Sequence, residues 1–155
     1  KHLLRFSPRG QAVFDCLNVV EPCLKSGNVT VVIAAIHLFI KWTEGEASLR
    51  SEVYKRVRVP LLTHMEGADT QTQYTLLLHL LTLANRSEDI FEHDYLHFFS
   101  RHNEPQYVVL VKMDILRTIA SENNYLPILR ETNQHIIDAD MAVSLKAIQT
   151  IGDVG

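Results

Sequence analysis

Cysteine and glycine are scarce in this chain of 155 residues, and each shortage excludes a kind of site. The 2 cysteines, Cys16 and Cys23, lie in one predicted helix, which separates their Cα atoms by about 10 Å, beyond the roughly 7 Å reach of a disulfide. We therefore expect free thiols and a reduced, intracellular setting. The 6 glycines lie near turns or termini, which leaves little material for a catalytic or phosphate-binding loop.

Charge of one sign and long hydrophobic runs are also lacking. The chain has 15 Lys and Arg against 18 Asp and Glu, so bulk electrostatics do not predict nucleic-acid binding. The longest mainly apolar stretch, residues 29–40, is well short of the roughly 20 residues that span a bilayer. The chain starts at Lys1, with no initiator Met or leader, and ends with residues 151–155. From these two ends we expect an excised fragment.

Two glycosylation sequons begin at Asn28 and Asn85. A secreted protein would display such sites on loops. Both asparagines also fall where a helix cap or helix end would place an Asn. Capping is the favoured interpretation, and glycosylation remains its alternative.

A repeat is the most informative feature that is present. Short polar residues precede apolar helical stretches at Asn28, Asp69, Glu104 and Asp140, which are 35 to 41 residues apart. That period is typical of helical hairpins that bury their apolar stripes only by stacking on one another. No stretch alternates with period two for long enough to predict a strand. The sequence thus predicts an all-α, right-handed α-solenoid of HEAT or armadillo type.

Four hairpins are expected within one segment, residues 1–155: residues 9–42, 46–85, 88–121 and 124–152. Pro22 and Pro60 fall late in the first helices of two successive hairpins, where each should bend its helix. Pro105 and Pro127 are tolerated near helix starts, and Gly152 is read as the last helix's stop. The predicted inward stripes are Val13, Leu17, Val20 and Leu24; Val32, Ala35, Ile36 and Phe39; Leu49, Val53, Val57 and Leu61; Tyr74, Leu77, Leu78 and Leu81; Ile90, Phe91, Tyr95 and Phe98; Val109, Met113, Leu116 and Ala120; and Val143, Ala147, Ile148 and Ile151.

Histidines provide the best candidate for a chemical site. His93 and His97 are four apart, on one face of the predicted helix, and His102 follows five residues later. Metal-ligating histidines need such a shared face. The face points away from the apolar stripe, so a solvated pair is the simpler interpretation. His37, His64, His79 and His135 are scattered and are expected to be structural.

The basic residues Lys55, Arg56 and Arg58 could meet phosphates or lipid headgroups, although three charges are too few to bind strongly alone. No nucleophile elbow, phosphate-binding loop or His-Glu-x-x-His motif occurs. We therefore expect no catalytic, cofactor-binding or metal-binding residue, no cofactor and no enzymatic activity.

Three segments carry a family resemblance: residues 104–108 (Glu-Pro-Gln-Tyr-Val), 112–116 (Lys-Met-Asp-Ile-Leu) and 119–124 (Ile-Ala-Ser-Glu-Asn-Asn). They resemble the acidic-Pro-x-Tyr-Val segment, the Lys-Leu-Asp-Ile-Met core and the Leu-Ala-Ser-x-x-Asn turn of β-adaptins, the large β subunits of clathrin-type adaptor complexes. Residues 20–24, 28–32, 73–74 and 147–152 agree in order and spacing. Residues 95–99 resemble the fourth adaptor complex and residues 147–152 the third. Two parts of the chain depart from the β-adaptin pattern. They are Val109, where the family often has Lys, and residues 124–127.

The resemblance implies a trunk segment that holds the second large chain, the medium chain and the small chain of a coat adaptor. It further implies peripheral association with Golgi or endosomal membranes or coated vesicles, and no nucleic-acid or small-molecule substrate. No family site residue falls on a position of this chain.

Two other hypotheses stay open. A helical-repeat scaffold outside vesicle traffic, of the transport-receptor or phosphatase-regulatory type, would have no packing reason to share Glu104-Pro105-x-Tyr107. An enzyme would have to use His93, His97 and His102. Under any scaffold hypothesis a groove on one side of the stack should receive a partner, and the isolated chain should self-associate through its end hairpins.

Overall fold

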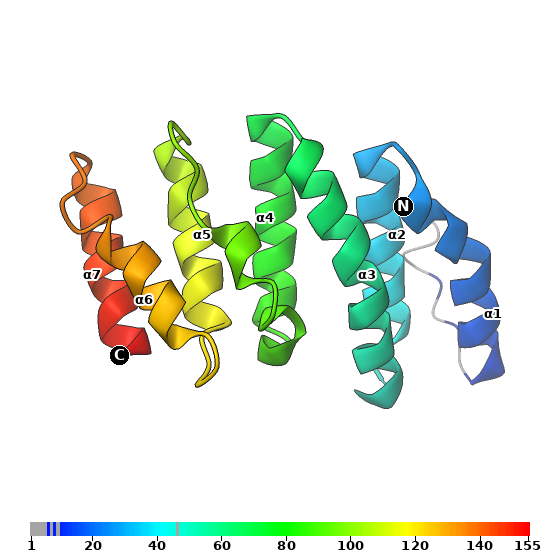
Figure 1. The fold of residues 1–155 in the computed structure, drawn as a ribbon. Helices are drawn as coiled ribbons and strands as arrows, with labels where there is room; N and C mark the ends of the chain where they lie inside the picture. The colour runs from blue at the N-terminus through cyan, green and yellow to red at the C-terminus, as the bar shows by residue number, and fades with distance from the viewer. Residues whose placement is uncertain (1–5, 7, 9, 46) are drawn as a thin grey trace. The chain divides into compact units, whose positions relative to one another are not determined.

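The computed structural model describes residues 6, 8, 10–45 and 47–155. Within these residues every regular element is helical and none is a strand, which confirms the all-α prediction. Cys16 and Cys23 are free thiols, as expected. The elements in chain order (Figure 1) are α1 (Gln11–Val20), η2 (Glu21–Lys25), α2 (Val29–Trp42), α3 (Ala47–Gly67), α4 (Thr70–Ala84), η3 (Glu88–Phe91), η4 (Tyr95–Phe98), α5 (Gln106–Thr118), α6 (Tyr125–Asn133) and α7 (Met141–Val154), where η marks a 3-10 helix.

The chain divides into two compact units, residues 1–64 and 65–155. In the first unit α1, η2 and α2 pack together. All four residues of the predicted stripe of α2 are buried, with Val32 and Phe39 fully so. The indole Nε1 of Trp42 donates to the carbonyl of Phe6 at 3.0 Å, which satisfies the polar atom of a nearly buried ring.

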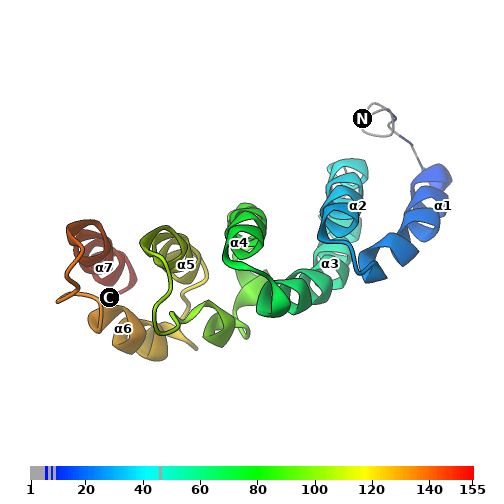
Figure 2. The same ribbon diagram turned by 90° about the horizontal axis from the view of Figure 1, so that it is seen from above.

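The second unit has two layers. Helices α4, α5 and α7 lie side by side in one layer, and the η3–η4 segment and α6 form the other (Figures 1 and 2). Phe91 and Phe98 lie fully buried with their rings edge to face, 5.9 Å between centroids. Leu76, Leu77, Leu80, Ile115 and Ile128 are also fully buried. The core of this unit therefore lies between its two layers.

Three of the four predicted caps are confirmed. Asn28 accepts from the amide of Thr30 at 2.9 Å, which also supports the capping interpretation of its sequon. Asp69 accepts from two amides at the start of α4, and Asp140 from two at the start of α7. Each side chain satisfies amide groups that the first helical turn leaves without partners.

The fourth predicted cap is wrong. Pro105, not Glu104, is the N-cap of α5, and no side chain caps that helix. The carboxylate of Glu104 instead binds the buried ammonium of Lys112. A buried ammonium without a partner would be costly, and this carboxylate supplies the opposite charge, so it turns inward.

Of the two late prolines, Pro60 lies late inside its helix as predicted, whereas Pro22 does not. α1 ends at Val20, and Pro22 lies at the start of the separate helix η2. Pro60 lies inside α3, which continues to Gly67. The predicted start of the first hairpin at Arg9 and of the second at residue 46 lie outside the described residues.

The prediction of one helix through residues 88–98 is wrong, although Ile90, Phe91 and Phe98 are buried as expected. Residues seven apart in an α-helix are separated by about 10.5 Å along its axis. Phe91 and Phe98 could not bring their rings to 5.9 Å in that geometry. Two short 3-10 helices separated by a turn allow the contact. The predicted turn at residues 101–103 is present, with Asn103 at a φ of 62°.

Two predicted stripes are rotated. In α4, Leu78 is exposed, while Gln73, Leu76, Leu80 and Leu83 are buried. In α7, Ile148 is exposed, Thr150 is fully buried, and the helix runs past Gly152 to Val154. Both helices carry apolar side chains on nearly every face, so periodicity does not identify the buried one.

Candidate functional site

The histidine cluster does not form. His93 lies in a turn between η3 and η4, so it does not share a helix face with His97. The Nδ1 atom of His97 lies 2.9 Å from a carboxylate oxygen of Glu66, and His93 and His102 are exposed. Across residues 6, 8, 10–45 and 47–155, no three His, Cys, Asp or Glu side chains are placed to hold a metal ion.

The basic run on α3 is largely engaged with acidic neighbours. Lys55 lies 3.5 Å from Glu52, and Arg56 lies 3.8 Å from Glu21. Val57, which follows Arg56, is fully buried, as predicted. The described helices include none that is long and apolar enough to cross a membrane.

A buried ion pair is the main electrostatic feature of the second unit. The side chain of Lys112 on α5 is 1% exposed, and its ammonium donates to both carboxylate oxygens of Glu104 at 2.5 and 2.7 Å. It also donates to the carbonyl of Phe99 at 3.0 Å. Glu104 in turn accepts from the amide of Arg101. Lys112 thus holds residues 99–104 against α5.

Burial is the main influence on the charge of this lysine. Removal from water lowers the pKa of Lys112 below its ordinary value of 10.5, and the Glu104 carboxylate opposes that change. A buried ammonium without a partner would be costly, because the interior does not replace its hydration. The sequence signal for this site was a lysine inside the apolar run of α5, eight residues after an acidic residue.

Ser100 extends the cluster to α6. Its amide and its hydroxyl both donate to one oxygen of Glu131, at 2.9 and 2.6 Å. The hydroxyl has one hydrogen, so the 2.7 Å contact between Ser100 Oγ and His135 Nε2 has the ring N–H as its donor. These bonds join the segment before α5 to the helix after it. No pattern in the sequence indicated them, because 31 and 35 residues separate the partners.

A second cluster joins η3 to the turn after α5. The buried amide of Asn124 donates to the carbonyls of Glu92 and Ile119, both at 3.0 Å, and accepts from the amide of Ser121 at 2.7 Å. The Ser121 hydroxyl and the Asn123 amide both donate to a Glu92 carboxylate oxygen at 2.7 Å. The cluster fixes where the chain leaves α5 and enters α6.

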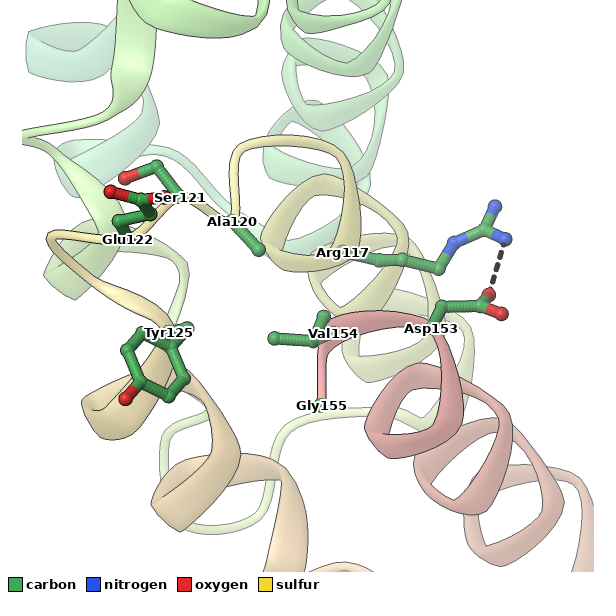
Figure 3. A pocket seen from close by; sticks show the side chains of 8 residues that line it. All are labelled: Arg117, Ala120, Ser121, Glu122, Tyr125, Asp153, Val154 and Gly155. Atoms are coloured by element: carbon green, nitrogen blue, oxygen red, sulfur yellow. Dashed lines mark hydrogen bonds and ion pairs between the residues drawn. The ribbon is translucent and has the colours of Figure 1, made fainter.

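A surface pocket of about 410 Å³ lies beside this turn (Figure 3). Arg117 and Asp153 form an ion pair of 3.0 Å at one side, and Tyr125 lies at the other. Ser121 also lines the pocket, but its hydroxyl hydrogen is engaged with Glu92. That hydrogen bond is one of those that fix the turn between α5 and α6.

Aromatic rings connect the neighbouring helices α4 and α5. Tyr74 and Tyr107 meet edge to face with 5.0 Å between ring centroids. With Glu104, Lys112, Ser121 and Asn124, these tyrosines are residues of the segments that resemble β-adaptins. The shared motif residues are thus the ones that fasten one helix or turn to the next.

Comparison with known proteins decides the family. The family model described as "Adaptin N terminal region" matches residues 3–155. The chain belongs to the adaptin family. This adaptin is 32% identical over 142 residues to Beta-adaptin-like protein A of Arabidopsis thaliana, covering 92% of this chain and 17% of that protein.

Two further relatives are subunits of named adaptor complexes. AP-4 complex subunit beta of Dictyostelium discoideum is 28% identical over 155 residues, covering 96% of this adaptin and 18% of that protein. AP-1 complex subunit beta-1 of Homo sapiens is 29% identical over 136 residues, covering 86% of this adaptin and 14% of that protein. The resemblance to β-adaptins is confirmed, and the chain spans less than a fifth of the length of these relatives. Assignment to the third or fourth complex stays a prediction.

Proposed function

We propose that this adaptin is the scaffold segment of an adaptor-complex β subunit in vesicle-mediated protein transport. It holds the second large chain, the medium chain and the small chain, and it has no enzymatic role. The observation that carries the proposal is the placement of the family's motif residues. Glu104, Lys112, Ser121 and Asn124 make internal bonds that fix helices relative to one another, which is what a rigid support requires.

The outer face of α7 supports a stacked architecture. Met141, Leu145 and Ile148 follow one another at helical spacing and are 76%, 54% and 53% exposed. A groove of about 280 Å³ beside them is lined by Leu126, Leu129 and Ile151, among others. An apolar stripe of this kind is the surface that a neighbouring hairpin covers in a helical-repeat protein. We infer that residues 1–155 form one solenoid segment, and that a further hairpin of the same polypeptide packs here.

Membrane association through the assembled complex is part of the proposal. The names of the relatives place them in adaptor complexes, and the described helices offer no membrane span. We therefore expect peripheral binding to Golgi or endosomal membranes. Cell fractionation should find the full-length protein on membranes and release it with alkaline carbonate. Retention on carbonate-washed membranes would contradict peripheral binding.

Affinity purification of the full-length protein, followed by mass spectrometry, tests the scaffold role. Recovery of a medium and a small adaptor chain in near-equal amounts would support it. A clean preparation that lacks both would refute it. The family match and the motif Glu104-Pro105-x-Tyr107 favour this function over a repeat scaffold outside traffic.

A further inference from the structure

His135 lies directly after α6, where the chain enters the turn that leads to α7. Its side chain is 17% exposed and is in contact with polar groups of three segments. The Nε2 atom lies 2.7 Å from the hydroxyl oxygen of Ser100 and 3.7 Å from a carboxylate oxygen of Glu131 on α6. The Nδ1 atom lies 3.7 Å from a carboxylate oxygen of Asp138 in the turn. One imidazole ring therefore lies between two carboxylates.

The neighbouring hydrogen bonds determine which nitrogen of the ring carries the proton. The Ser100 hydroxyl donates its one hydrogen to Glu131 at 2.6 Å, so it accepts a hydrogen bond from the Nε2–H group of His135. In the neutral ring Nδ1 is then the nitrogen with a free lone pair. Its charged neighbour, the carboxylate of Asp138, can also only accept. As long as the ring is neutral, two acceptors meet at this contact.

The other groups around the ring leave an excess of negative charge. Lys112 of α5 lines the same small cavity as the ring, but its ammonium is bound to both carboxylate oxygens of Glu104. From α7, the hydroxyl of Ser144 donates to a backbone carbonyl of the turn and carries no charge. The carboxylates of Glu131 and Asp138 thus lie beside the ring without a cation of their own in these contacts. A positive charge on the ring would be attracted by both.

Asp138 connects the ring to the start of α7. One of its carboxylate oxygens lies near Nδ1 of His135, and the other accepts from the amide of Asp140 at 2.9 Å. Asp140 is the N-cap of α7, and its own carboxylate accepts from the amides of Ala142 and Val143. An attraction between His135 and Asp138 therefore fixes the residue from which α7 begins.

We propose that His135 is a proton-dependent latch of the turn between α6 and α7. Uptake of one proton at Nδ1 replaces the contact between two acceptors with an ion pair to Asp138, and it leaves the bond from Nε2 to Ser100 in place. The protonated chain then holds the first turn of α7 more firmly than the neutral chain does. This stabilisation is present at acidic pH and is lost as the pH rises and the ring releases its proton. The latch goes beyond the scaffold role and requires no partner subunit.

Amide hydrogen exchange of the full-length chain, measured by mass spectrometry on peptides that cover residues 141–148, tests the latch. Exchange is compared at about pH 8 and about pH 6, a range in which histidine ordinarily changes its charge. Each rate is divided by the intrinsic rate of an unfolded peptide at the same pH. We expect these amides to be about two- to fivefold more protected at the lower pH, the effect of one part-exposed ion pair. Loss of a proton from Lys112 would act in the opposite direction, and it is common to every variant.

Two substitutions each remove one half of the latch. Asp138→Asn removes the charge and keeps an oxygen that can accept from the amide of Asp140, and the position is 36% exposed, so the variant should fold. His135→Gln removes the titrating ring and keeps a donor for Ser100. In both variants the extra protection at lower pH should disappear. The matched control is His102→Gln in the exposed turn before α5, which should keep the ratio of the wild type.

Each outcome decides for or against the latch. Loss of the extra protection in both variants, together with its retention in His102→Gln, would support it. A wild-type chain that is no better protected at the lower pH would refute it. So would extra protection that survives in Asp138→Asn, because the carboxylate would then not be the partner of the proton. The recovery of adaptor chains in the affinity purification affects none of these results, so the latch and the scaffold role can fail separately.

Discussion

The ammonium of Lys112 lies 2.5 and 2.7 Å from the two carboxylate oxygens of Glu104, in a site where the lysine side chain is 1% exposed. The seven residues between them, 105–111, contain the N-cap and the first turns of α5, and the turn at Arg101 to Asn103 comes directly before Glu104. One ion pair therefore closes the loop that leads into a central helix of the second unit. Its removal should affect more than the two residues involved.

Lys112→Ala should be among the most destabilising single substitutions in the chain. It leaves the Glu104 carboxylate, 9% exposed, without its cation, and breaking a buried pair in this way costs about 3–5 kcal/mol. Urea unfolding followed by circular dichroism measures the change. The matched control is Lys146→Ala, which removes a partner of Asp114 that is 22% exposed, against 1% for Lys112, and should cost less than about 1 kcal/mol. Equal effects of the two substitutions would contradict a special role for Lys112.

The stability contributed by Lys112 should depend on pH with a definite sign. Burial lowers the pKa of Lys112 in the folded chain below its ordinary value of 10.5. Between those two pKa values the unfolded chain binds more protons, so stability should rise with pH in that window. The free energy of unfolding of wild type minus that of Lys112→Met, measured from pH 7.5 to 10.5, isolates this effect. If this difference in the free energy of unfolding fell as the pH rose, the predicted direction of the pH dependence would be wrong.

Asp69 should give the opposite dependence in acid. Hydrogen bonds from the side chain and the amide of Thr72 lower the pKa of Asp69 below 3.8. Its contribution is present above pH 3.8 and is lost as the pH falls through the lowered folded value. Asp69→Asn keeps a capping side chain without a titrating group. Thermal unfolding between pH 6 and 3 should show a smaller loss of stability in Asp69→Asn than in wild type.

The isolated chain should self-associate through α7. Met141, Leu145 and Ile148 form an apolar stripe that lacks a covering element within the described residues. Sedimentation velocity over a range of concentrations should show oligomers, and Leu145→Glu should shift the distribution toward monomer. Gln134→Glu, in the exposed turn after α6, adds the same charge elsewhere and should leave the distribution unchanged. A monomer at every concentration would refute the prediction.

Local chemistry explains the sequence predictions that were confirmed. Asn28, Asp69 and Asp140 cap helices by bonding to amides two or three residues further on, so no distant residue is needed. The stripe of α2 was also predicted correctly, since Lys41 and His37 lie on its exposed side and leave one continuous apolar face. The β-adaptin resemblance rested on short motifs that local spacing preserves.

The buried face of α4 could not be identified from sequence. Leu78 was assigned to the core because seven of the nine residues from Leu76 to Ala84, Leu78 included, are leucine or alanine. Every face of the helix therefore looked apolar. The same ambiguity misplaced Ile148 in α7. Choosing the buried face of such a helix requires its packing partners, which here are α5 and, for α7, both α5 and α6.

By itself, the sequence determined the helical content, three of the four caps and the family, because these depend on residues within a few positions of one another. The tertiary structure alone decided where Glu104 points, how residues 88–98 fold and which face of α4 is left open. The reason is the same in each case. A buried ammonium that needs a partner, a pair of buried phenylalanine rings and a neighbouring helix compete with local preference, and none of these contacts can be located from residues within a few positions.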